Sequence, residues 1–378
     1  MLPIEIRRVK SRAERATFVK MAFRFYRQDP LWVPPLISEQ IDFIDPAKGV
    51  FFDHGEAELF LAYRGDQPVG RISAHINRRH DDIYGGGKGF IGFFECENCL
   101  DTAKTLFTTA ENWLRGRGRT VAEGPMSFGV YDELGVLVDG FDTPPYLLTV
   151  YNPPYYRELF EKCEWEKAVD WFAFRGRKGF TDARLDPKYF RLSEKVLKRE
   201  GIVLRPMDVA GHLDREAQIV KSIFAEAWSE NWGHVPLSDG EFERLKGSLV
   251  HMVVPELCLV AELGGKPVAF TLSAYDANVA VKKTNGRLFP FGFITLLTGI
   301  KKTDRFRLIL MGVVGENRKQ GIEVAMYTRM IEEGVRLGFR EVEMSMIVEN
   351  NERMLASISH LPVERYKTWR VFRKDLSQ

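Results

Sequence analysis

Residues that would mark particular protein classes are scarce in this chain of 378 residues, beginning with cysteine and histidine. The sequence has 4 cysteines and 7 histidines. So few cysteines exclude a disulfide framework and indicate a reducing, cytoplasmic setting. The one close pair, Cys96 and Cys99, lacks the second pair or the spaced histidines of a zinc site, so we expect no metal.

The chain also has no large excess of either charge sign and few long apolar runs. Lysine and arginine total 54 against 52 aspartates and glutamates, a net charge of +2, which argues against a nucleic-acid partner. The N-terminal residues contain no apolar core of signal-peptide length. The longest apolar run begins at Leu288 and ends at Ile300. It is much shorter than the ~20 residues of a membrane-spanning helix.

The apolar run 288–300 is bracketed by basic residues. Three lie within 282–287, and Lys301 and Lys302 follow the run directly. Two interpretations remain open. One, which we favour, is a buried strand or hairpin with solvated ends. The other is a peripheral contact with the anionic inner face of a membrane.

An internal repeat is the first feature that the chain does contain. Residues 57–76 (AELFLAYRGDQPVGRISAHI) consist of an apolar strand, a tight turn and a second strand. Residues 256–275 (ELCLVAELGGKPVAFTLSAY) have the same order, with Pro-Val just after the turn in both copies. A repeat over this distance, about 200 residues, indicates duplication of a whole domain.

The segments after the two hairpins also correspond. The expected elements are a strand at 89–96, a helix from Asp101 (its cap) to about Arg115 and a strand at 120–123 in the first half, and a strand at 307–314, a helix at 321–337 and a strand at 341–348 in the second. We therefore predict an α/β fold with mixed sheets (α+β) and two tandem domains, 1–178 and 188–378, with a polar linker between them.

The stretch VVGENRKQGIEVAM at 313–326 leads from a strand into a helix. A helix N-terminus offers unpaired N–H groups and the positive end of the helix dipole, where a phosphate can bind. Gly315 and Gly321 give the turn backbone freedom, while Arg318 and Lys319 add positive charge. The glycine spacing is not that of a dinucleotide-binding fingerprint, which argues against a nucleotide cofactor of that kind.

This stretch resembles the acyl-CoA pyrophosphate loop of the GNAT acyltransferases, in which Arg-x-x-Gly-x-Gly/Ala opens a helix after two apolar strand residues. The resemblance implies acyl-CoA or acetyl-CoA as co-substrate, with the backbone of the strand end paired to pantetheine. It also implies an Asn at the start of the helix after the next strand, where Asn350 and Asn351 stand. The implied donor-binding residues are Val313, Val314, Arg318, Lys319, Gln320, Gly321, Ile322 and Asn350.

A more particular resemblance covers nearly the whole chain. The blocks at 123–142 (EGPMSFGVYDELGVLVDGFD), 143–165, 227–236 (AWSENWGHVP) and 346–351 (MIVENN) are similar to the bacterial ceramide synthase-like branch of the GNAT superfamily. That branch implies two tandem GNAT domains. It also implies N-acylation of a small-molecule primary amine, such as a sphingoid or other lipid amine, with a long acyl group.

Two positions depart from the GNAT pattern. Glu323 stands where the loop has its final Gly or Ala. If its side chain points outward, the phosphate site is intact; if it points toward the amides, phosphopantetheine on an acyl carrier protein becomes the better donor. The tyrosine that GNAT enzymes use as general acid is absent from the helix after Asn350, and Tyr366 is the nearest substitute. An alternative function is therefore a non-catalytic GNAT-like protein that binds an acyl or carrier-protein ligand.

The first half lacks this loop. Its corresponding turn reads FFECENCLDTAK at 93–104, and its acidic residues Glu95, Glu97 and Asp101 would repel a pyrophosphate. We therefore assign the donor site to the second domain.

N-acylation requires that the amine lose a proton before it attacks. The pKa of an alkylammonium is near ~10, so a group beside the donor strand has to accept that proton. Glu349 is our candidate for this role, and Tyr366 is the candidate acid for the leaving thiolate. Trp228, Asn231 and Trp232 are expected to line the acceptor pocket. A strand-end carboxylate for Glu349 and core packing for the tryptophans are the alternatives.

Overall fold

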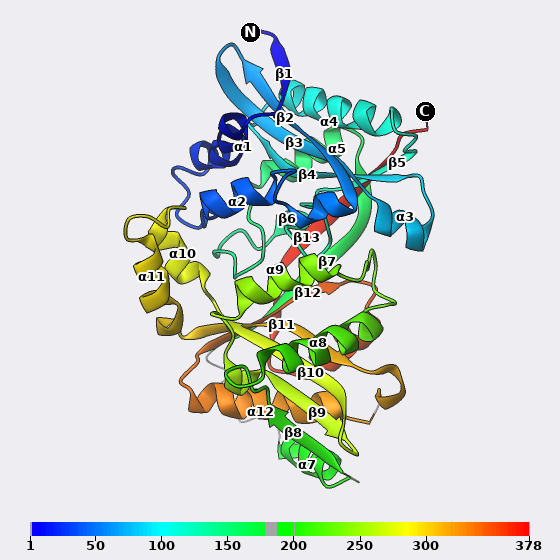
Figure 1. Cartoon of the computed structure of the whole chain (residues 1–378), viewed down its shortest axis with the longest axis vertical. Helices are drawn as coiled ribbons and strands as arrows, with labels where there is room; N and C mark the ends of the chain where they lie inside the picture. The colour runs from blue at the N-terminus through cyan, green and yellow to red at the C-terminus, as the bar shows by residue number, and fades with distance from the viewer. Residues whose placement is uncertain (1, 178–186, 200, 319, 378) are drawn as a thin grey trace. The chain divides into compact units, whose positions relative to one another are not determined.

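The computed structural model describes residues 2–177, 187–199, 201–318 and 320–377. The chain forms two compact units, and strands β7 (Glu166–Gly176) and β13 (Glu364–Asp375) contribute residues to both (Figure 1). The predicted linker lies almost wholly outside the described residues, and the boundaries 1–178 and 188–378 stay a prediction. The first unit consists of Met1–Trp171, Val281–Thr295 and Lys367–Gln378, and the second of Phe172–Ala280 and Leu296–Tyr366.

The first unit is built on a mixed sheet. Its elements are β1 (Ile4–Arg8), α1 (Arg12–Phe25), α2 (Ile37–Phe43), β2 (Gly55–Arg64), β3 (Gln67–Asn77), α3 (Arg78–Tyr84), β4 (Lys88–Cys96), α4 (Leu100–Arg115), β5 (Val121–Gly124), β6 (Val136–Asp139) and α5 (Tyr155–Lys162). The strand order is β1-β2-β3-β4-β5-β13, with β6 paired to β13. Strands β4 and β5 run parallel and are connected by α4, whereas the hairpin β2–β3 is antiparallel.

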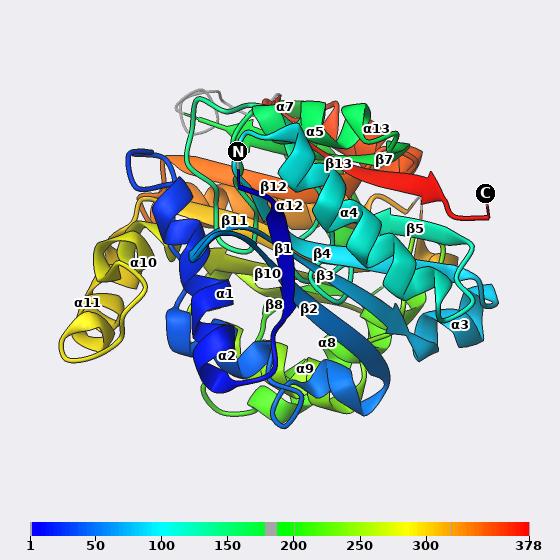
Figure 2. The ribbon, with the colours of Figure 1, turned by 90° about the horizontal axis from the view of Figure 1, so that it is seen from above.

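Alternation along β2 explains why both faces of this sheet carry helices. Successive strand side chains point to opposite faces. Phe60 and Ala62 belong to a buried cluster that includes α4 and α5, whereas Leu59 and Leu61 belong to a second cluster that includes α1 and α2. Figure 2 shows α4 on one side of these strands and α1 and α2 on the other.

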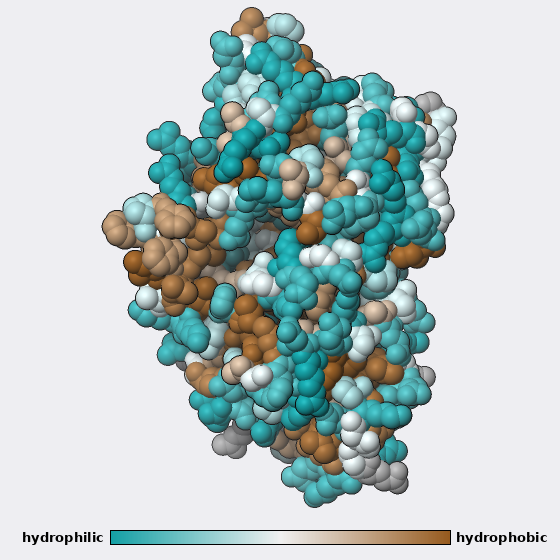
Figure 3. Space-filling view, viewed as in Figure 1, coloured by the Kyte–Doolittle hydropathy of each residue, from teal (hydrophilic) through white to brown (hydrophobic). Residues whose placement is uncertain are grey.

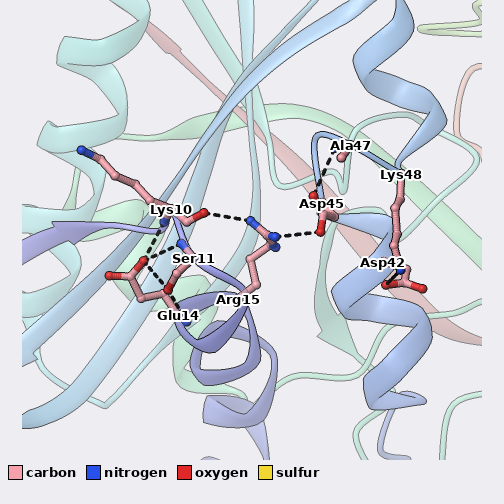
Figure 4. A network of polar contacts seen from close by, with 8 residues as sticks. All are labelled: Lys10, Ser11, Glu14, Arg15, Asp42, Asp45, Ala47 and Lys48. Carbon is pink, nitrogen blue, oxygen red and sulfur yellow. Dashed lines mark hydrogen bonds and ion pairs between the residues drawn. The ribbon is translucent and has the colours of Figure 1, made fainter.

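Local capping fixes the start of α1. The Ser11 hydroxyl accepts a hydrogen bond from the Glu14 amide, and the Glu14 carboxylate accepts one from the Ser11 amide at 2.7 Å, which together form a capping box (Figure 4). Arg15 then donates to the Asp45 carboxylate at 2.7 Å and ties α1 to the turn after α2. Because both side chains of this pair are mostly buried, the contact helps to hold α1 and α2 on the same face of the sheet.

The second unit repeats the plan. Its elements are α7 (Pro187–Leu197), β8 (Ile202–Pro206), α8 (Leu213–Ala227), α9 (Asp239–Leu249), β9 (Leu259–Leu263), β10 (Lys266–Tyr275), β11 (Arg305–Val313), α12 (Ile322–Arg336), β12 (Glu341–Val348) and α13 (Glu352–Ile358). The strand order is β7-β12-β11-β10-β9-β8. Strands β11 and β12 run parallel and are connected by α12. Buried side chains of α7 and α12 pack on one face, and α8 lies against β10 and β11.

The repeat predicted from the sequence is present in the structure. The hairpin β2–β3 corresponds to β9–β10, and the crossover β4–α4–β5 corresponds to β11–α12–β12. The α/β fold class with mixed sheets is therefore confirmed. One local prediction is wrong: Cys99 is the N-cap residue of α4, and Asp101 lies within the first turn of the helix instead of capping it.

The apolar run 288–300 is not the buried strand or hairpin that the sequence analysis favoured. Residues Gly292–Gly299 form helix α11, which follows α10 (Asn278–Thr284) and has no buried residue. A contiguous apolar run has no period that separates strand from helix, so the sequence could not discriminate between them. Among the described residues, none of the helices combines the length and the apolar character needed to cross a membrane.

Candidate donor-binding and acyl-transfer site

The parallel strands β11 and β12 stop pairing before either of them ends. Their ladder runs from Arg305 opposite Glu341 to Leu308 opposite Met344. Strand β11 nevertheless continues to Val313 on its partner β10, and β12 continues to Val348. The backbone of β11 beyond Leu308 is therefore not used in a ladder with β12. An extended ligand that needs backbone partners finds them at this position.

The turn after β11 presents an open helix N-terminus. The Val314 amide donates to the Val268 carbonyl at 2.9 Å, and a short 3-10 turn follows at Gly315–Asn317. Gly321 is the N-cap residue of α12 with φ 79°, in the left-handed region, and it provides no side-chain cap. Since no side chain caps this end, the amides of the first turn of α12 are available to an anion.

Arg318 lies beside this N-terminus, with its guanidinium folded back on the end of the strand. Its Nε donates to the Val313 carbonyl at 3.2 Å, and its Nη2 donates to the Ala227 carbonyl at 3.1 Å. Its Nη1 is 3.6 Å from the Glu230 carboxylate, which is largely exposed. The arginine therefore fixes the shape of the loop as well as contributing charge. The predicted neighbour Lys319 lies outside the described residues.

Another carboxylate already occupies one amide of the turn. The Gly315 N–H donates to Glu226 Oε1 at 2.9 Å, and Glu226 lies on the exposed side of α8. This contact shows that the turn accepts a carboxylate at its outer amide. The inner amides, at the start of α12, carry no such partner among the described residues.

Glu323 lies in the first turn of α12, whose N-cap residue is Gly321. The residue is partly buried, and its Oε2 is buried without a hydrogen-bond partner in the described part of the chain. Burial raises the pKa of Tyr327, one turn further along the helix, and the Glu323 carboxylate adds to that increase. The buried Oε2 therefore accepts no hydrogen bond from the first-turn amides among the described residues. Whether the donor is CoA or a carrier-bound pantetheine stays a prediction.

Tyr366 lies on β13 and contacts a buried carboxylate. Its hydroxyl donates a hydrogen bond to Glu343 of β12, and Ser345 donates to the other oxygen of the same carboxylate. The Glu343 side chain is 0% exposed, and Tyr366 is 9% exposed. The Arg175 guanidinium stacks over the Tyr366 ring at 4.3 Å from its centroid. The hydroxyl is therefore held in one position.

A buried arginine completes this cluster. Arg307 Nη2 donates to the Ser345 carbonyl at 3.1 Å, and its Nε is 3.7 Å from Glu343 Oε1. Burial lowers the pKa of Arg307, while the nearby Glu343 carboxylate acts in the opposite direction. Arg307 and Glu343 lie just before the last paired residues of β11 and β12. The cluster of Arg307, Glu343, Ser345 and Tyr366 thus marks the point where the two strands stop pairing.

The predicted site residues Glu349 and Asn350 follow β12 and differ in their exposure. Glu349 is partly buried in the turn, whereas Asn350 is exposed. Asn351, and not Asn350, is the N-cap residue of α13: its side chain accepts a hydrogen bond from the Met354 amide at 3.1 Å. The place at the helix start that the resemblance assigned to an asparagine is therefore filled by Asn351.

Of the three predicted acceptor residues, Trp228 packs on the donor strand and Asn231 contacts the start of α13. A Cβ atom at Gly312 of β11 would lie 2.6 Å from the Trp228 ring, so the indole packs directly on this strand. The Asn231 carboxamide accepts a hydrogen bond from Asn351 at 3.2 Å. Trp232 follows and is partly buried. The loop after α8 thus joins the donor strand to the start of α13.

Sequence reasoning missed several residues of this site. The strand pattern placed Glu343 and Ser345 on one face of β12, but nothing in the pattern separated Glu343 from the neighbouring acidic residues. Glu226 and Glu230 lie on or just after α8, far from the loop in sequence, and no local signal identifies them. Among the described residues, no group of three or more His, Cys, Asp or Glu side chains is arranged to hold a metal ion.

Comparisons with known proteins place this geometry in a family. The chain is 33% identical over 383 residues to the bacterial ceramide synthase of Caulobacter vibrioides (strain NA1000 / CB15N), covering 97% of this chain and 96% of that protein. It is 30% identical over 377 residues to the protein YghO of Escherichia coli (strain K12), covering 98% and 95%. No protein-family model matches the chain.

Two solved structures share the fold over the full length. A tandem GNAT protein from the clavulanic acid biosynthesis pathway has a TM-score of 0.57 and 13% identity, covering 100% of this chain and 99% of that one. A GCN5-related N-acetyltransferase from Sphaerobacter thermophilus has a TM-score of 0.53 and 13% identity, covering 100% and 97%. These two similarities show the fold alone. The two full-length relatives show that the chain belongs to the bacterial ceramide synthase-like family and is an acyltransferase, and its fold is that of the tandem GNAT proteins.

Proposed function

We propose that the chain transfers a long acyl group from acyl-CoA to the primary amine of a lipid-like acceptor, such as a sphingoid amine. The named activity of the Caulobacter relative supports this choice of acceptor and of bond formed. The observation that carries the donor half of the proposal is the uncapped N-terminus of α12, with Gly321 in the left-handed conformation and Arg318 beside it. A pyrophosphate is the ligand that such a site favours.

The contacts of Glu323 are compatible with CoA as the donor. A carboxylate that accepts from the first-turn amides would exclude a pyrophosphate, and Glu323 Oε2 accepts no hydrogen bond among the described residues. An acyl carrier protein stays the alternative donor. It would present the same pantetheine arm to β11 but would need no contact with Arg318.

The strand ends suggest how the acyl group is placed. Val313 and Val314 continue β11 beyond its ladder with β12, so the pantetheine arm of the donor can pair with them as an added strand. The thioester then lies toward Ser345 and the buried cluster. Trp228, packed on Gly312, provides apolar surface beside that path, and Asn231 provides a polar group.

The proton of the amine has two candidate acceptors. Glu349 is partly buried just after the end of β12. The Tyr366 hydroxyl donates to Glu343, so a proton that its oxygen takes from the amine would be balanced by transfer of its own proton to the carboxylate. In the transfer the amine nitrogen bonds to the thioester carbon, the carbon–sulfur bond breaks, and the proton lost by the amine balances the one gained by the thiolate.

The role of general acid, which the sequence analysis assigned to Tyr366, would require its hydroxyl to change orientation. Its proton is directed at Glu343 in this structure, so donation to a thiolate would need the hydroxyl to rotate away from a buried carboxylate. We therefore assign Tyr366 to the relay with Glu343. Glu349 stays a candidate base.

A thermal-shift measurement with acetyl-CoA, palmitoyl-CoA and CoA tests the donor. A ligand at one hundred times its Kd stabilises the folded protein by ~2.7 kcal/mol, which raises the melting temperature by several degrees. Arg318→Glu is expected to remove this shift. Arg329→Glu, an exposed position on the same helix, is the matched control and is expected to keep it.

Release of free thiol from palmitoyl-CoA in the presence of sphinganine then tests transfer. Thiol release that requires the amine supports the proposal. Binding of CoA without amine-dependent release would contradict the acceptor, and no thermal shift with any thioester would contradict the donor.

A further inference from the structure

We propose that helix α11 and the loop before it form a docking surface for the anionic surface of a lipid bilayer. The surface consists of an apolar patch, Phe289, Phe291, Phe293, Ile294 and Leu297, with basic residues on either side along the chain. The proposal goes beyond acyl transfer and does not depend on which amine is the acceptor.

The apolar patch is the most exposed apolar surface of the described chain. Phe289 is 79% exposed, Phe291 72% and Leu297 69%. Helix α11 has no buried residue, so folding of the chain does not explain these side chains. Figure 3 shows the patch as brown side chains at the left, where Figure 1 draws α10 and α11 in yellow. Contiguous exposed apolar surface of this kind marks an interaction site.

Along the chain, the charged residues that flank the patch within 277–303 are all basic. Residues 277–303 contain five basic residues and no acidic one. Lys283, Arg287, Lys301 and Lys302 are exposed, and none of them forms an ion pair within the described residues. Lys282 donates to the Pro30 carbonyl. Unpaired cations next to exposed aromatic and aliphatic side chains complement anionic headgroups above an apolar acyl region.

The length of α11 limits how deeply it could enter a lipid bilayer. Eight residues span ~12 Å along the axis, against ~30 Å for the hydrocarbon core of a bilayer. The patch therefore can enter only the headgroup and upper acyl region, with the cations at the level of the phosphates. Binding of this kind is peripheral and reversible, and it weakens when salt screens the charges.

A second copy of the chain fits this surface less well. Two such patches in contact would bring two sets of cations together without an acidic residue to pair with them. A stable interface also needs ~800 Å² on each partner, which five side chains on one short helix do not supply. An anionic bilayer satisfies both the apolar and the charged parts.

Sedimentation of the full-length protein with lipid vesicles tests the proposal without any substrate. The protein is expected to sediment with vesicles of phosphatidylcholine and phosphatidylglycerol and to remain in solution with phosphatidylcholine alone. The triple variant Phe289→Ser, Phe291→Ser and Leu297→Ser is expected to lose about tenfold or more in vesicle affinity. The double variant Lys301→Glu and Lys302→Glu is expected to lose a similar factor at low salt and less at high salt.

Matched controls remove surface character elsewhere. Val203→Ser removes an exposed aliphatic side chain from β8, and Lys195→Glu with Lys198→Glu reverses two exposed charges on or next to α7. Both variants are expected to bind vesicles as the parent does. Circular dichroism and an unchanged melting temperature show that each variant is folded.

Several results would overturn the inference. They are no sedimentation of the parent with anionic vesicles, equal sedimentation of the triple variant, and an equal loss in the control variants. A dimer of the parent that becomes a monomer in the triple variant, observed by sedimentation velocity, would assign the patch to a second copy instead. None of these results would bear on donor binding, because the docking surface shares no residue with the donor loop.

Discussion

The two crossover turns of this molecule occupy the same place in two copies of one fold and differ in what they can bind. In the second unit, the turn from β11 to α12 has Gly321 in the left-handed region, an uncapped helix start and Arg318 beside it. In the first unit, the turn from β4 to α4 has Cys99 as N-cap residue, and this helix start has no side-chain cap either. It also carries a carboxylate, Glu97, that accepts from Thr102 at 2.7 Å and lies 2.8 Å from Arg64.

The difference separates what the fold provides from what the loop provides. Both units supply a strand, a turn and a helix N-terminus, and therefore the same backbone dipole. The first unit uses the position for an internal charge pair, which leaves a negative group where a phosphate would have to bind. Neither helix start has a side-chain cap, so the two turns differ in the charge beside them: Glu97 at the first and Arg318 at the second. The fold thus supplies the position, and a few side chains decide whether an anion can use it.

The two units also each bury a carboxylate against tyrosine. In the first unit, Glu95 accepts from Tyr156 at 2.6 Å and from Tyr26 at 3.0 Å, and burial raises the pKa of Glu95. In the second, Glu343 accepts from Tyr366 and Ser345 at the point where β11 and β12 stop pairing. The tyrosine–glutamate pair at Glu95 has no donor loop beside it. It therefore serves as an internal control for the catalytic role proposed for the pair at Glu343.

The largest expected effect comes from filling the space at Gly321. Gly321→Val places a β-branched residue at φ 79° and a Cβ 3.0 Å from Val196 Cγ2, so the turn has to shift. We expect donor affinity to fall by about 100-fold or more, because the first-turn amides no longer converge on one phosphate. Titration calorimetry with acetyl-CoA measures this directly.

Gly338→Val is the matched control for that variant. Gly338 also has a positive φ, 84°, but it follows the C-terminal end of α12 and a Cβ there meets nothing within 4 Å. It is expected to lose stability through backbone strain and to keep donor affinity. Equal affinity losses in the two variants would mean that the turn is not the donor site.

Removing one hydroxyl from each buried tyrosine–glutamate pair should separate the two units. Tyr366→Phe is expected to lower kcat by about 30-fold with donor affinity unchanged, because the proton relay is broken. Tyr156→Phe removes an equivalent hydrogen bond to Glu95 and should cost about 1–2 kcal/mol of stability with little change in kcat. Amine-dependent thiol release gives kcat, and a melt gives stability. Equal kcat losses would refute the relay.

Acid should destabilise both units through buried histidines. Burial lowers the pKa of His75 to about 3, and it lowers those of His80 and His234 to about 4. Between these values and the unfolded pKa near 6.5, the unfolded state binds more protons, so stability falls as the pH falls. At pH 5 each histidine costs about 2 kcal/mol relative to pH 7.

The histidines can be separated by substitution. His75→Gln in the first unit and His234→Gln in the second should each reduce the loss of stability between pH 7 and pH 5. Denaturant melts at both pH values test this expectation. A pH dependence identical to that of the parent in both variants would mean that these imidazoles are not the groups that titrate.

The smallest expected effect concerns Glu323. Glu323→Gln removes a negative charge near the first turn of α12 while keeping the shape of the side chain, so donor affinity should rise by about threefold. Asp101→Asn makes the same change at the corresponding first turn of α4 and should leave donor affinity unchanged. Weaker donor binding in Glu323→Gln would show that the carboxylate assists the donor instead.

Much of this account was accessible from the sequence because the relevant signals are local. The two hairpins, the crossover helices and the loop from Val313 to Gly321 follow from apolar periods and glycine positions, and the structure has them within a few residues. The resemblance of the loop to a family pattern then identified the donor turn. Local pattern does not show which of two neighbouring asparagines caps α13, and here it is Asn351.

The rest depends on contacts between distant segments. Glu226 reaches Gly315 from α8, and Tyr366 reaches Glu343 from another strand, so no window of sequence contains either pair. The prediction of a buried strand or hairpin at 288–300 was wrong for a different reason. The composition of this run is that of a core segment, and only the tertiary structure shows that no residue of α11 is buried.

The stoichiometry of donor binding tests the central claim most directly. Equilibrium dialysis of the full-length protein with acetyl-CoA is predicted to give one bound donor per chain, and Arg318→Glu is predicted to give none. Two bound donors per chain would contradict the inference that the first turn, with Glu97 beside it, does not bind a donor. No bound donor in the parent protein would contradict the assignment of the second turn as open.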